Sequence, residues 1–512
     1  MTVNDAIKKF NEKISASDRM AFLCAFFAGL LIHMPAMLMD VPNHDGLSSM
    51  YFSQNMITSG RWFLGVACAA SSYFTVPWII GLIGLLELSL TAVLLVRIFE
   101  TDNPVIIMLI SALLVSFPSL GSTFAYVFTL DGYMMGLFLS VLAVYLAKKD
   151  HFFFGGISLA FSLGIYQSYL AFAMLLSVYC IWDFMIRGEK GCIKKSMNFI
   201  YMGLGGAVLY YVLLMILLKV QGKVLDTYQG IDNLSGGGLS GRIQTIPGIY
   251  GNFVKFTLSK GFLTGPASET AALILGCCTL FAAAALIINR FLVKKLWFWW
   301  VGLLTLILVP VSANVVLLIT PQVNYHLIMR YQWVLFWMAA LKICDRYVTY
   351  SKGVSKQLVS WISFAAALVI VISYAVSVNI GYTNLQRKYE KTYAYAVRLL
   401  DRIENTEGYY HGIPVVIMGV IGDDEFPPAD LTSSVTGDMI GLEGDYLLYS
   451  GYNYQTFFRH YLGADINVIS MDVVPEIYYS DEYVSMESFP GETSVKYVDG
   501  KILVKTEDAV RD

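Results

Sequence analysis

The sequence predicts a mainly α-helical, polytopic membrane protein: a helical bundle of about eleven spans with a small extracytoplasmic α/β domain at its C-terminus. Of the 512 residues, 56% are hydrophobic and 14% are charged, whereas roughly a quarter of a soluble domain is charged. The mean hydropathy is +0.60. A net charge of -3 leaves no basic excess, which argues against a nucleic-acid-binding protein.

The apolar runs define the predicted spans. Residues 1–19 are polar and precede the first run, Met20–Met39, which lacks a small-residue cleavage pattern, so we expect an uncleaved first span with a cytoplasmic N-terminus. The later runs are Val76–Val96, Pro104–Phe117, Gly132–Leu146, Phe152–Tyr166, Tyr169–Ile186, Phe199–Leu218, Ala271–Ile288, Leu296–Ile319, Tyr331–Ile343 and Leu358–Val378. Several are shorter than the ~20 residues of a straight span, which leaves a re-entrant form open for them.

The distribution of basic residues predicts the orientation. Alternating sides give the inner segments 18 Lys and Arg residues and the outer segments before Val378 seven. Basic residues resist translocation, so this asymmetry supports the topology, and an odd number of spans places the C-terminus outside. We therefore expect a membrane domain over residues 20–378, with outer loops at 40–75 and 220–270, and an extracytoplasmic domain over 379–512. The second loop contains the glycine run Gly236–Gly238.

The C-terminal region combines helix and strand patterns. Asn384–Asn405 has helical periodicity, and Val415–Gly419 is typical of a buried strand. Val495–Val504 alternates around Asp499-Gly500, a dipeptide that favours a tight hairpin turn. These patterns predict a small α/β domain on a short stalk.

The first outer loop carries the strongest candidates for chemistry. Asp40 and Asp45, with His44 beside the latter, follow the first span directly, and Arg61 is an isolated cation further along. The intervening Gly46–Gly60 is expected to rest on the bilayer as an interfacial helix. Acids at the membrane surface followed by a lone cation suit a lipid-linked phosphate substrate, whereas the alternative is a solvated loop.

Three further features lie at outer ends of spans. Asp131 begins a span and is either a substrate-binding carboxylate or a helix-end group in water. The tight turn Gly164–Tyr169 offers Tyr166 and Gln167, which could hydrogen-bond a sugar or simply cap the turn. Arg330 is the lone cation of its outer segment, and it is either an interfacial anchor or a phosphate clamp.

Motifs for nucleotides and metals do not occur in the sequence. It has no Walker loop, dinucleotide fingerprint, H-E-x-x-H pair or G-x-S-x-G elbow. Seven cysteines are present without a C-x-x-C pair, which predicts small packing residues rather than a zinc site or disulfide framework. We therefore expect no cofactor and no resident metal; the sequence does not address whether turnover uses a divalent cation.

Several segments together resemble the GtrII-type bacterial glucosyltransferases, multi-pass enzymes of the GT-C class. They are the acid of the first outer loop with Gly60-Arg61-Trp62, then Phe124–Leu146, Gly164–Phe172 and Arg330–Leu341. The order and spacing of the segments carry the resemblance, which covers the membrane region. Where the family often has two adjacent acids, this chain has His44-Asp45.

The resemblance implies transfer of a hexose, expected to be glucose, from a polyprenyl-phosphate donor such as undecaprenyl-phosphate glucose. The acceptor would be a surface or cell-wall glycan, such as an O-antigen, on the outer face of the bacterial cytoplasmic membrane. A flippase and a donor-synthesising glycosyltransferase are the protein partners that this implies. The alternatives are a polymerase or ligase of lipid-linked glycans and a non-enzymatic transporter of them.

The chemistry of such a transfer assigns roles to the candidates. A lipid phosphate is already a good leaving group, so one carboxylate suffices as general base on the acceptor hydroxyl. Asp45 is the expected base and Asp40 its rival, since both stay at the membrane surface. Arg61 and Arg330 are expected to bind the donor phosphate. Direct attack would invert the anomeric centre.

Overall fold

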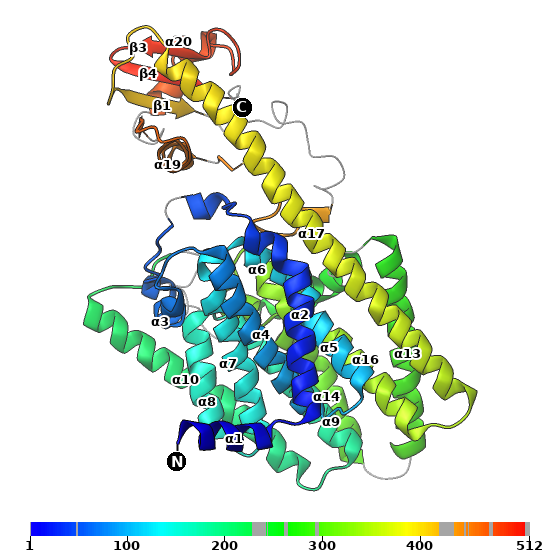
Figure 1. Cartoon of the computed structure of the whole chain (residues 1–512). Helices are drawn as coiled ribbons and strands as arrows, with labels where there is room; N and C mark the ends of the chain where they lie inside the picture. The colour runs from blue at the N-terminus through cyan, green and yellow to red at the C-terminus, as the bar shows by residue number, and fades with distance from the viewer. Residues whose placement is uncertain are drawn as a thin grey trace.

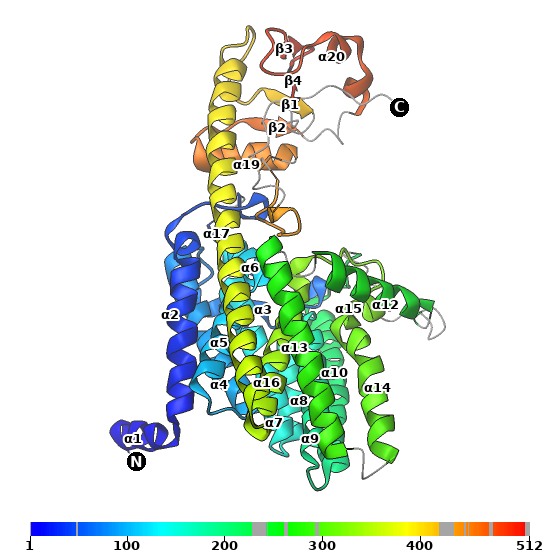
Figure 2. The same ribbon diagram turned by 90° about the vertical axis from the view of Figure 1, so that its right-hand side faces the viewer.

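Long apolar helices make up most of the computed structural model, which describes residues 2–47, 50–227, 242, 244–260, 265–291, 296–418, 435–444, 447–448, 450–469 and 475–506. The helices run side by side in a bundle, with α1 (Val3–Lys13) across one end and a small β-sheet beyond the other (Figures 1 and 2). We call these the N-terminal end and the sheet end. The glycine run Gly236–Gly238 lies outside the described residues.

The helices of the bundle match the apolar runs of the sequence. They are α2 (Ala16–Leu38), α4 (Pro77–Phe99), α5 (Pro104–Ser116), α6 (Pro118–Ala125), α7 (Leu130–Lys148), α8 (Phe152–Ile165), α9 (Tyr169–Arg187), α10 (Cys192–Gln221), α13 (Pro266–Phe291), α14 (Leu296–Ala313), α16 (Val334–Tyr350) and α17 (Val354–Glu404). Within the described residues, seven helices are long and apolar enough to cross a membrane, or eight if α5 and α6, bent by 42°, form one span. The mainly α-helical membrane fold is confirmed, and the number of eleven spans stays a prediction.

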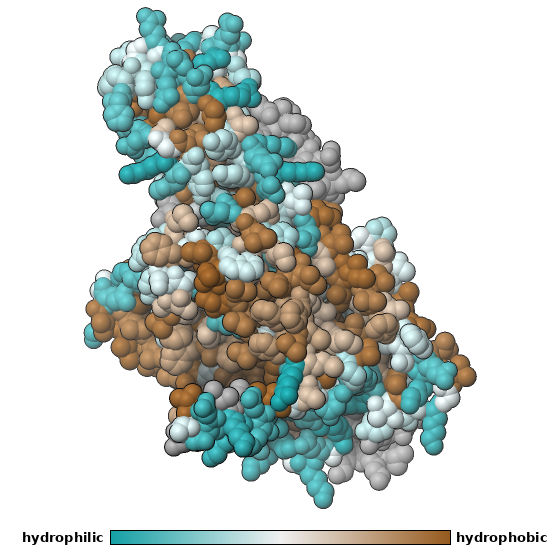
Figure 3. Space-filling model, in the orientation of Figure 1, coloured by the Kyte–Doolittle hydropathy of each residue, from teal (hydrophilic) through white to brown (hydrophobic). Residues whose placement is uncertain are grey.

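Local sequence explains where several helices begin. Proline opens α4, α5 and α6, where its fixed φ suits the first turn and its missing N–H costs no hydrogen bond. Ser15 caps α2 in a reciprocal pair with Asp18, and Asn103 caps α5. On the face shown in Figure 3, the surface around the middle of the bundle is mostly hydrophobic, between hydrophilic ends. That belt has the character of a bilayer-facing surface.

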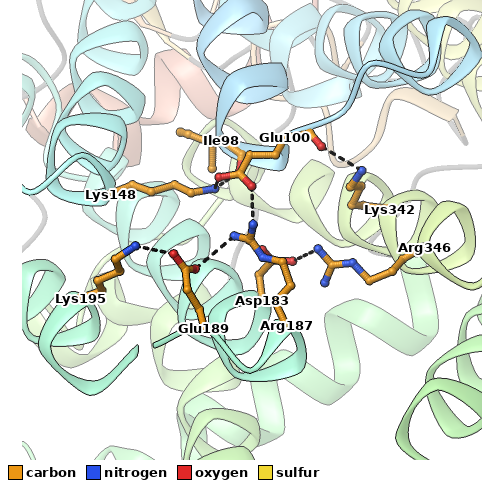
Figure 4. A network of polar contacts seen from close by, with 9 residues as sticks. All are labelled: Ile98, Glu100, Lys148, Asp183, Arg187, Glu189, Lys195, Lys342 and Arg346. Atoms are coloured by element: carbon orange, nitrogen blue, oxygen red, sulfur yellow. Dashed lines mark hydrogen bonds and ion pairs between the residues drawn. The ribbon is translucent and has the colours of Figure 1, made fainter. Parts of the chain in front are cut away.

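An ion-pair network joins the helix connections at the N-terminal end (Figure 4). The Glu100 carboxylate forms an ion pair with Lys148 at 2.8 Å and another with Arg187. Arg187 pairs with Asp183 at 2.8 Å, and Asp183 in turn binds Arg346. These residues come from α7, α9, α16 and the connection after α4, so the network ties four parts of the chain together. The charges at this end include those that predicted the inner segments.

The helix α17 links the membrane bundle to the C-terminal domain. It runs unbroken for 51 residues, from beside α13 and α16 to the sheet (Figures 1 and 2). The apolar run Leu358–Val378 and the helical periodicity predicted over Asn384–Asn405 both fall within this one helix, and the domain boundary at residue 379 stays a prediction. Hydropathy changes abruptly there, but Gly381 remains helical and packs closely against Leu442, so the backbone continues without a break.

The sheet has four strands in the order β2-β1-β4-β3. The strand β1 (Pro414–Met418) lies parallel to β2 (Asn467–Ile469) and to β4 (Lys501–Lys505), while β3 (Val495–Val498) pairs antiparallel with β4. Asp499 and Gly500 both have positive φ, 46° and 78°, as the tight hairpin turn requires. The buried strand and the hairpin predicted from sequence are confirmed.

Short helical segments complete the fold. They are η1 (His44–Leu47), η2 (Ile57–Ser59), α3 (Leu64–Ala67), η3 (Cys68–Ser71), η4 (Val127–Thr129), α12 (Ile246–Lys255), η6 (Phe256–Lys260), α15 (Val315–Ile319), η7 (Leu327–Trp333), α19 (Gly451–Tyr461), η9 (Pro475–Tyr479) and α20 (Asp481–Ser485). Most of them lie at the sheet end, over the open ends of the long helices (Figures 1 and 2).

The interfacial helix expected over Gly46–Gly60 does not form in the residues that the structure describes there. Over residues 50–56 the chain is non-helical, with Gln54 at φ 53° and an isolated bridge between Met56 and Arg61. Tertiary contacts override the helical pattern, because the Gln54 amide donates to the Phe128 carbonyl oxygen at 2.6 Å. The α-helical turn of this loop falls later, in α3.

Candidate functional site

A turn at the start of the first loop presents His44 and Asp45 at the sheet end. The buried Asn43 side-chain oxygen accepts the backbone N–H groups of Asp45 at 3.0 Å and of Gly46 at 2.9 Å, which fixes the turn. The Asp45 side chain is 56% exposed, and its carboxylate lies 3.6 Å from His44 Nε2. Asp45 is therefore an accessible carboxylate on a fixed backbone.

The C-terminal domain contacts His44. Asn453 of α19 donates to the His44 carbonyl oxygen at 3.3 Å, and the imidazole meets the Tyr126 ring edge-on. Burial lowers the pKa of His44; the Asp45 charge raises it, and the Lys388 charge lowers it further. A pKa below its ordinary value favours the neutral imidazole, whose Nε2 faces the Asp45 carboxylate at 3.6 Å.

Asp40, the rival acid, faces other neighbours. It is exposed directly after α2, and its charge contributes, after burial, to raising the pKa of Tyr461 in α19. The same charge contributes to raising the pKa of Tyr389 in α17, again after burial. Asp40 thus lies near α17 and α19, whereas Asp45 lies beside His44.

Arg61 is fixed by two aromatic side chains, one from α7 and one from the turn after α8. Its Nη1 donates to the Tyr133 hydroxyl at 3.1 Å, and its guanidinium carbon lies 5.1 Å from the centre of the Tyr166 ring. The Tyr133 and Tyr166 rings stack on each other at 4.7 Å with 11° between their planes. Because the two rings support each other, the guanidinium has a defined position.

The turn between α8 and α9 holds the loop that carries Arg61. Gln167 donates to the Ser59 carbonyl oxygen at 3.0 Å and to the Tyr210 hydroxyl at 3.1 Å. Tyr210 donates in turn to the Gly60 carbonyl oxygen at 3.1 Å, and Gly60 has a positive φ of 76° that favours glycine. The sequence had left Gln167 between sugar binding and capping, and the structure shows it bonded to the Arg61 loop.

Close packing at Gly164 joins the same two segments. The Phe63 backbone N–H donates to the Gly164 carbonyl oxygen at 2.7 Å. A Cβ on Gly164 would lie 2.6 Å from the Trp62 indole, so a side chain has no room there. The segments Gly60-Arg61-Trp62 and Gly164–Tyr169, far apart in sequence, therefore form one unit.

Arg330 lies in a cage of aromatic rings. The residue is 5% exposed, with its guanidinium 4.0 Å from the centre of the Phe256 ring and 3.9 Å from that of Tyr325. It donates to the Tyr325 carbonyl oxygen at 3.0 and 3.3 Å and to the Asn252 side-chain oxygen at 2.9 Å. Arg330 is thus a rigid cation, and it is not the loose interfacial anchor of the alternative interpretation.

A polar cavity of about 290 Å³ opens beside Arg330. It is lined by residues of the membrane domain, among them Arg330 and His326, and by Asp438 and Glu443 from the C-terminal region. Lys388 of α17 fixes the C-terminal side of the cavity. Its buried ammonium donates to the carbonyl oxygens of Gly441 at 3.3 Å and Glu443 at 2.8 Å. The cavity therefore lies between the two parts of the protein.

His326 connects the two arginines and was missed by the sequence analysis. Burial and, to a smaller extent, the positive charges of Arg61 and Arg330 together lower the pKa of His326 to about 4. His326 and Arg330 line the same cavity. A histidine four residues before Arg330 was the available signal, and Tyr133, two residues after Asp131, was another.

Asp131 lies inside the bundle rather than in open solvent. It is 1% exposed, and its carboxyl lies beside the Ser71 hydroxyl and the Cys68 thiol of η3. Glu87 of α4, 8% exposed, is a further neighbour. Asp131 therefore contacts the underside of the α3–η3 segment.

In the described part of the chain, no three His, Cys, Asp or Glu side chains are grouped in an arrangement that could hold a metal ion. Comparison with curated proteins and with solved structures gives no match. The family model described as Glucosyl transferase GtrII matches residues 34–341, a range that begins in the last turns of α2 and ends in α16. Every candidate site residue, from Asp40 to Arg330, lies within it. The chain thus belongs to the GtrII glucosyl transferase family and is a membrane glycosyltransferase.

Proposed function

We propose that this enzyme transfers glucose from a polyprenyl-phosphate donor to a surface or cell-wall glycan, on the outer face of the bacterial cytoplasmic membrane. The observation that carries the proposal is that an accessible carboxylate and two arginines in fixed positions lie at the sheet end. Asp45 is 56% exposed, Arg61 is held by Tyr133 and Tyr166, and Arg330 lines the polar cavity. An anionic lipid headgroup and a neutral sugar acceptor need those two kinds of group.

Asp45 acts as the general base in this proposal. The acceptor hydroxyl oxygen attacks the anomeric carbon, and the bond from that carbon to the phosphate oxygen breaks. The hydroxyl proton passes to the Asp45 carboxylate, and the polyprenyl phosphate leaves with the bonding electrons. Direct displacement inverts the anomeric centre. His44, 3.6 Å from the carboxylate, orients it.

The arginines stabilise the departing phosphate. Charge builds on the phosphate oxygens as the sugar leaves, and fixed cations lower the energy of that state without reorganising. Arg61 is held by Tyr133 and Tyr166, and Arg330 by Tyr325 and Asn252, so both are already positioned. His326, neutral at pH 7, can hydrogen-bond the phosphate or sugar between them.

Three further candidates have positioning roles. Tyr166 stacks under the Arg61 guanidinium, and Gln167 holds the carbonyl oxygen of Ser59, two residues before Arg61. Asp131 supports the α3–η3 segment from below. These residues act through Arg61 and the loop that carries it.

The sheet end is the outer face in this proposal. The N-terminal end carries the ion-pair network and most of the basic residues of the helix connections (Figure 4). A donor made inside must then cross the membrane before use. A flippase and a donor-synthesising glycosyltransferase are therefore the expected partners of the enzyme.

The test is glucose transfer by purified protein from a radiolabelled polyprenyl-phosphate glucose to a glycan acceptor. Replacing the base, Asp45→Asn, should reduce kcat by about 10²–10⁴-fold. Asp40→Asn is the matched control and should stay near wild type. A dead Asp40→Asn beside an active Asp45→Asn would transfer the role to Asp40. Wild-type protein that moves intact lipid-linked glycan across liposomes without transferring sugar would favour the transporter alternative.

A further inference from the structure

A long groove marks the surface of the bundle between α7 and α8, beneath α3. Its volume is about 550 Å³. From α7 it is lined by Met135, Leu139, Leu142 and Leu146, whose spacing of four, three and four places them on one face of the helix. At 1.5 Å per residue this stripe is about 16 Å long, roughly half of a ~30 Å hydrocarbon core.

The groove offers apolar surface and no free hydrogen-bonding group among its described lining residues. Ser158 is the polar side chain in the lining, and its hydroxyl already donates to the Leu139 carbonyl oxygen at 2.8 Å. Two lining residues are strongly exposed, Val66 at 60% and Phe154 at 61%. The groove is therefore open to an apolar ligand that enters from the side of the bundle.

The sheet end of the groove leads to Arg61. Phe161 of α8 lines the groove and contacts the ring of Phe63, also a lining residue, at 4.6 Å between centroids. The same Phe161 contacts Trp62 at 5.4 Å. Phe63 in the groove wall thus follows Arg61 by only two positions in the polypeptide.

We propose that this groove binds the isoprenoid chain of the donor, with its phosphate directed toward Arg61. The inference rests on the proposed function, and it assigns the chain-binding subsite. An apolar groove that ends beside a fixed cation complements a molecule with one long apolar chain and an anionic end. The groove has one stripe of side chains on each helix, which fits one chain better than the paired chains of a phospholipid.

Filling the groove should weaken binding of long donors selectively. Leu139→Trp places an indole in the middle of the stripe, while Leu204→Trp on α10, 63% exposed and outside the lining, is the matched control. For a long-chain polyprenyl-phosphate glucose, Leu139→Trp should raise KM about tenfold, because several chain carbons lose their buried contacts. For a donor of two isoprene units, KM and kcat should stay at wild-type values, as should both constants in the control.

A binding experiment on the unmodified protein separates this inference from the proposed function. A sugar-free polyprenyl phosphate with a photoreactive group in the part of the chain nearest the phosphate should crosslink to peptides that contain Leu139 or Leu142, even if no glucose transfer is found. Transfer without this crosslink, and with equal KM for long donors in both tryptophan variants, would overturn the groove. So would equal displacement of the probe by phosphatidylglycerol, which would make the groove a general lipid contact.

Discussion

The sharpest prediction concerns Arg61→Lys, which keeps the positive charge and removes the planar fork. In the structure the guanidinium donates a hydrogen bond to the Tyr133 hydroxyl, at 3.1 Å, and lies 5.1 Å from the Tyr166 ring centre. A hydrogen bond from a charged group contributes about 1.5 kcal/mol, and the ring contact of a half-buried Arg about 0.5–1 kcal/mol. Losing both should lower kcat/KM by roughly 30- to 70-fold.

The assay is glucose transfer at low concentrations of a polyprenyl-phosphate glucose, with thermal unfolding recorded on the same preparation. Arg398→Lys is the matched control, since Arg398 contacts the Phe489 ring at 5.6 Å in the C-terminal domain, away from Arg61. Tyr133→Phe should lower kcat/KM about tenfold in the wild-type background. In the Arg61→Lys background it should add little, because the shared hydrogen bond is already lost.

The reasoning would be refuted by a change in kcat/KM of less than about threefold for Arg61→Lys, with the same Tm as wild type. Full additivity of Arg61→Lys and Tyr133→Phe would also refute it. In that case the two residues would act on turnover separately, and the position of the guanidinium would not depend on the Tyr133 hydroxyl.

Three further predictions address the topology and the stability of the site. A reporter active only in the cytosol, fused to the C-terminus, should stay silent, and strong activity would reverse the orientation. Lys388→Met should cost about 3 kcal/mol of stability, because two carbonyl oxygens lose a buried charged donor; an unchanged Tm relative to the exposed control Lys356→Met would contradict this. For His326 the folded pKa of about 4 lies below the ordinary 6.5, so the unfolded chain takes up the proton first, and stability falls from pH 6.5 toward pH 4. The loss should reach roughly 2 kcal/mol at pH 5, and His326→Asn should abolish that part of it, as measured by Tm at pH 7 and 5.

The site was partly visible in the sequence. The lone cations Arg61 and Arg330 and the acid Asp45 stand out, because charged residues are rare in this chain and their types limit the chemistry. Tyr133 and His326 do not stand out, since their importance comes from neighbours distant in sequence. The Tyr133 hydroxyl meets Arg61 across 72 positions, and His326 responds to charges on either side of it.

By itself, the sequence determined the membrane class, the main helices, strand β1 and the β3–β4 hairpin. Each of these depends on signals within about twenty residues: continuous hydropathy, alternation, and a turn dipeptide that tolerates positive φ. Tertiary structure decided the rest. The Gln54 amide donates a hydrogen bond to the Phe128 carbonyl oxygen, and Gln54 is not part of a helix. The helix α17 continues past Val378 because packing against the C-terminal domain supports it. The polar cavity beside Arg330 is formed by residues that are about a hundred positions apart in the sequence. Local sequence patterns cannot predict which such residues come together.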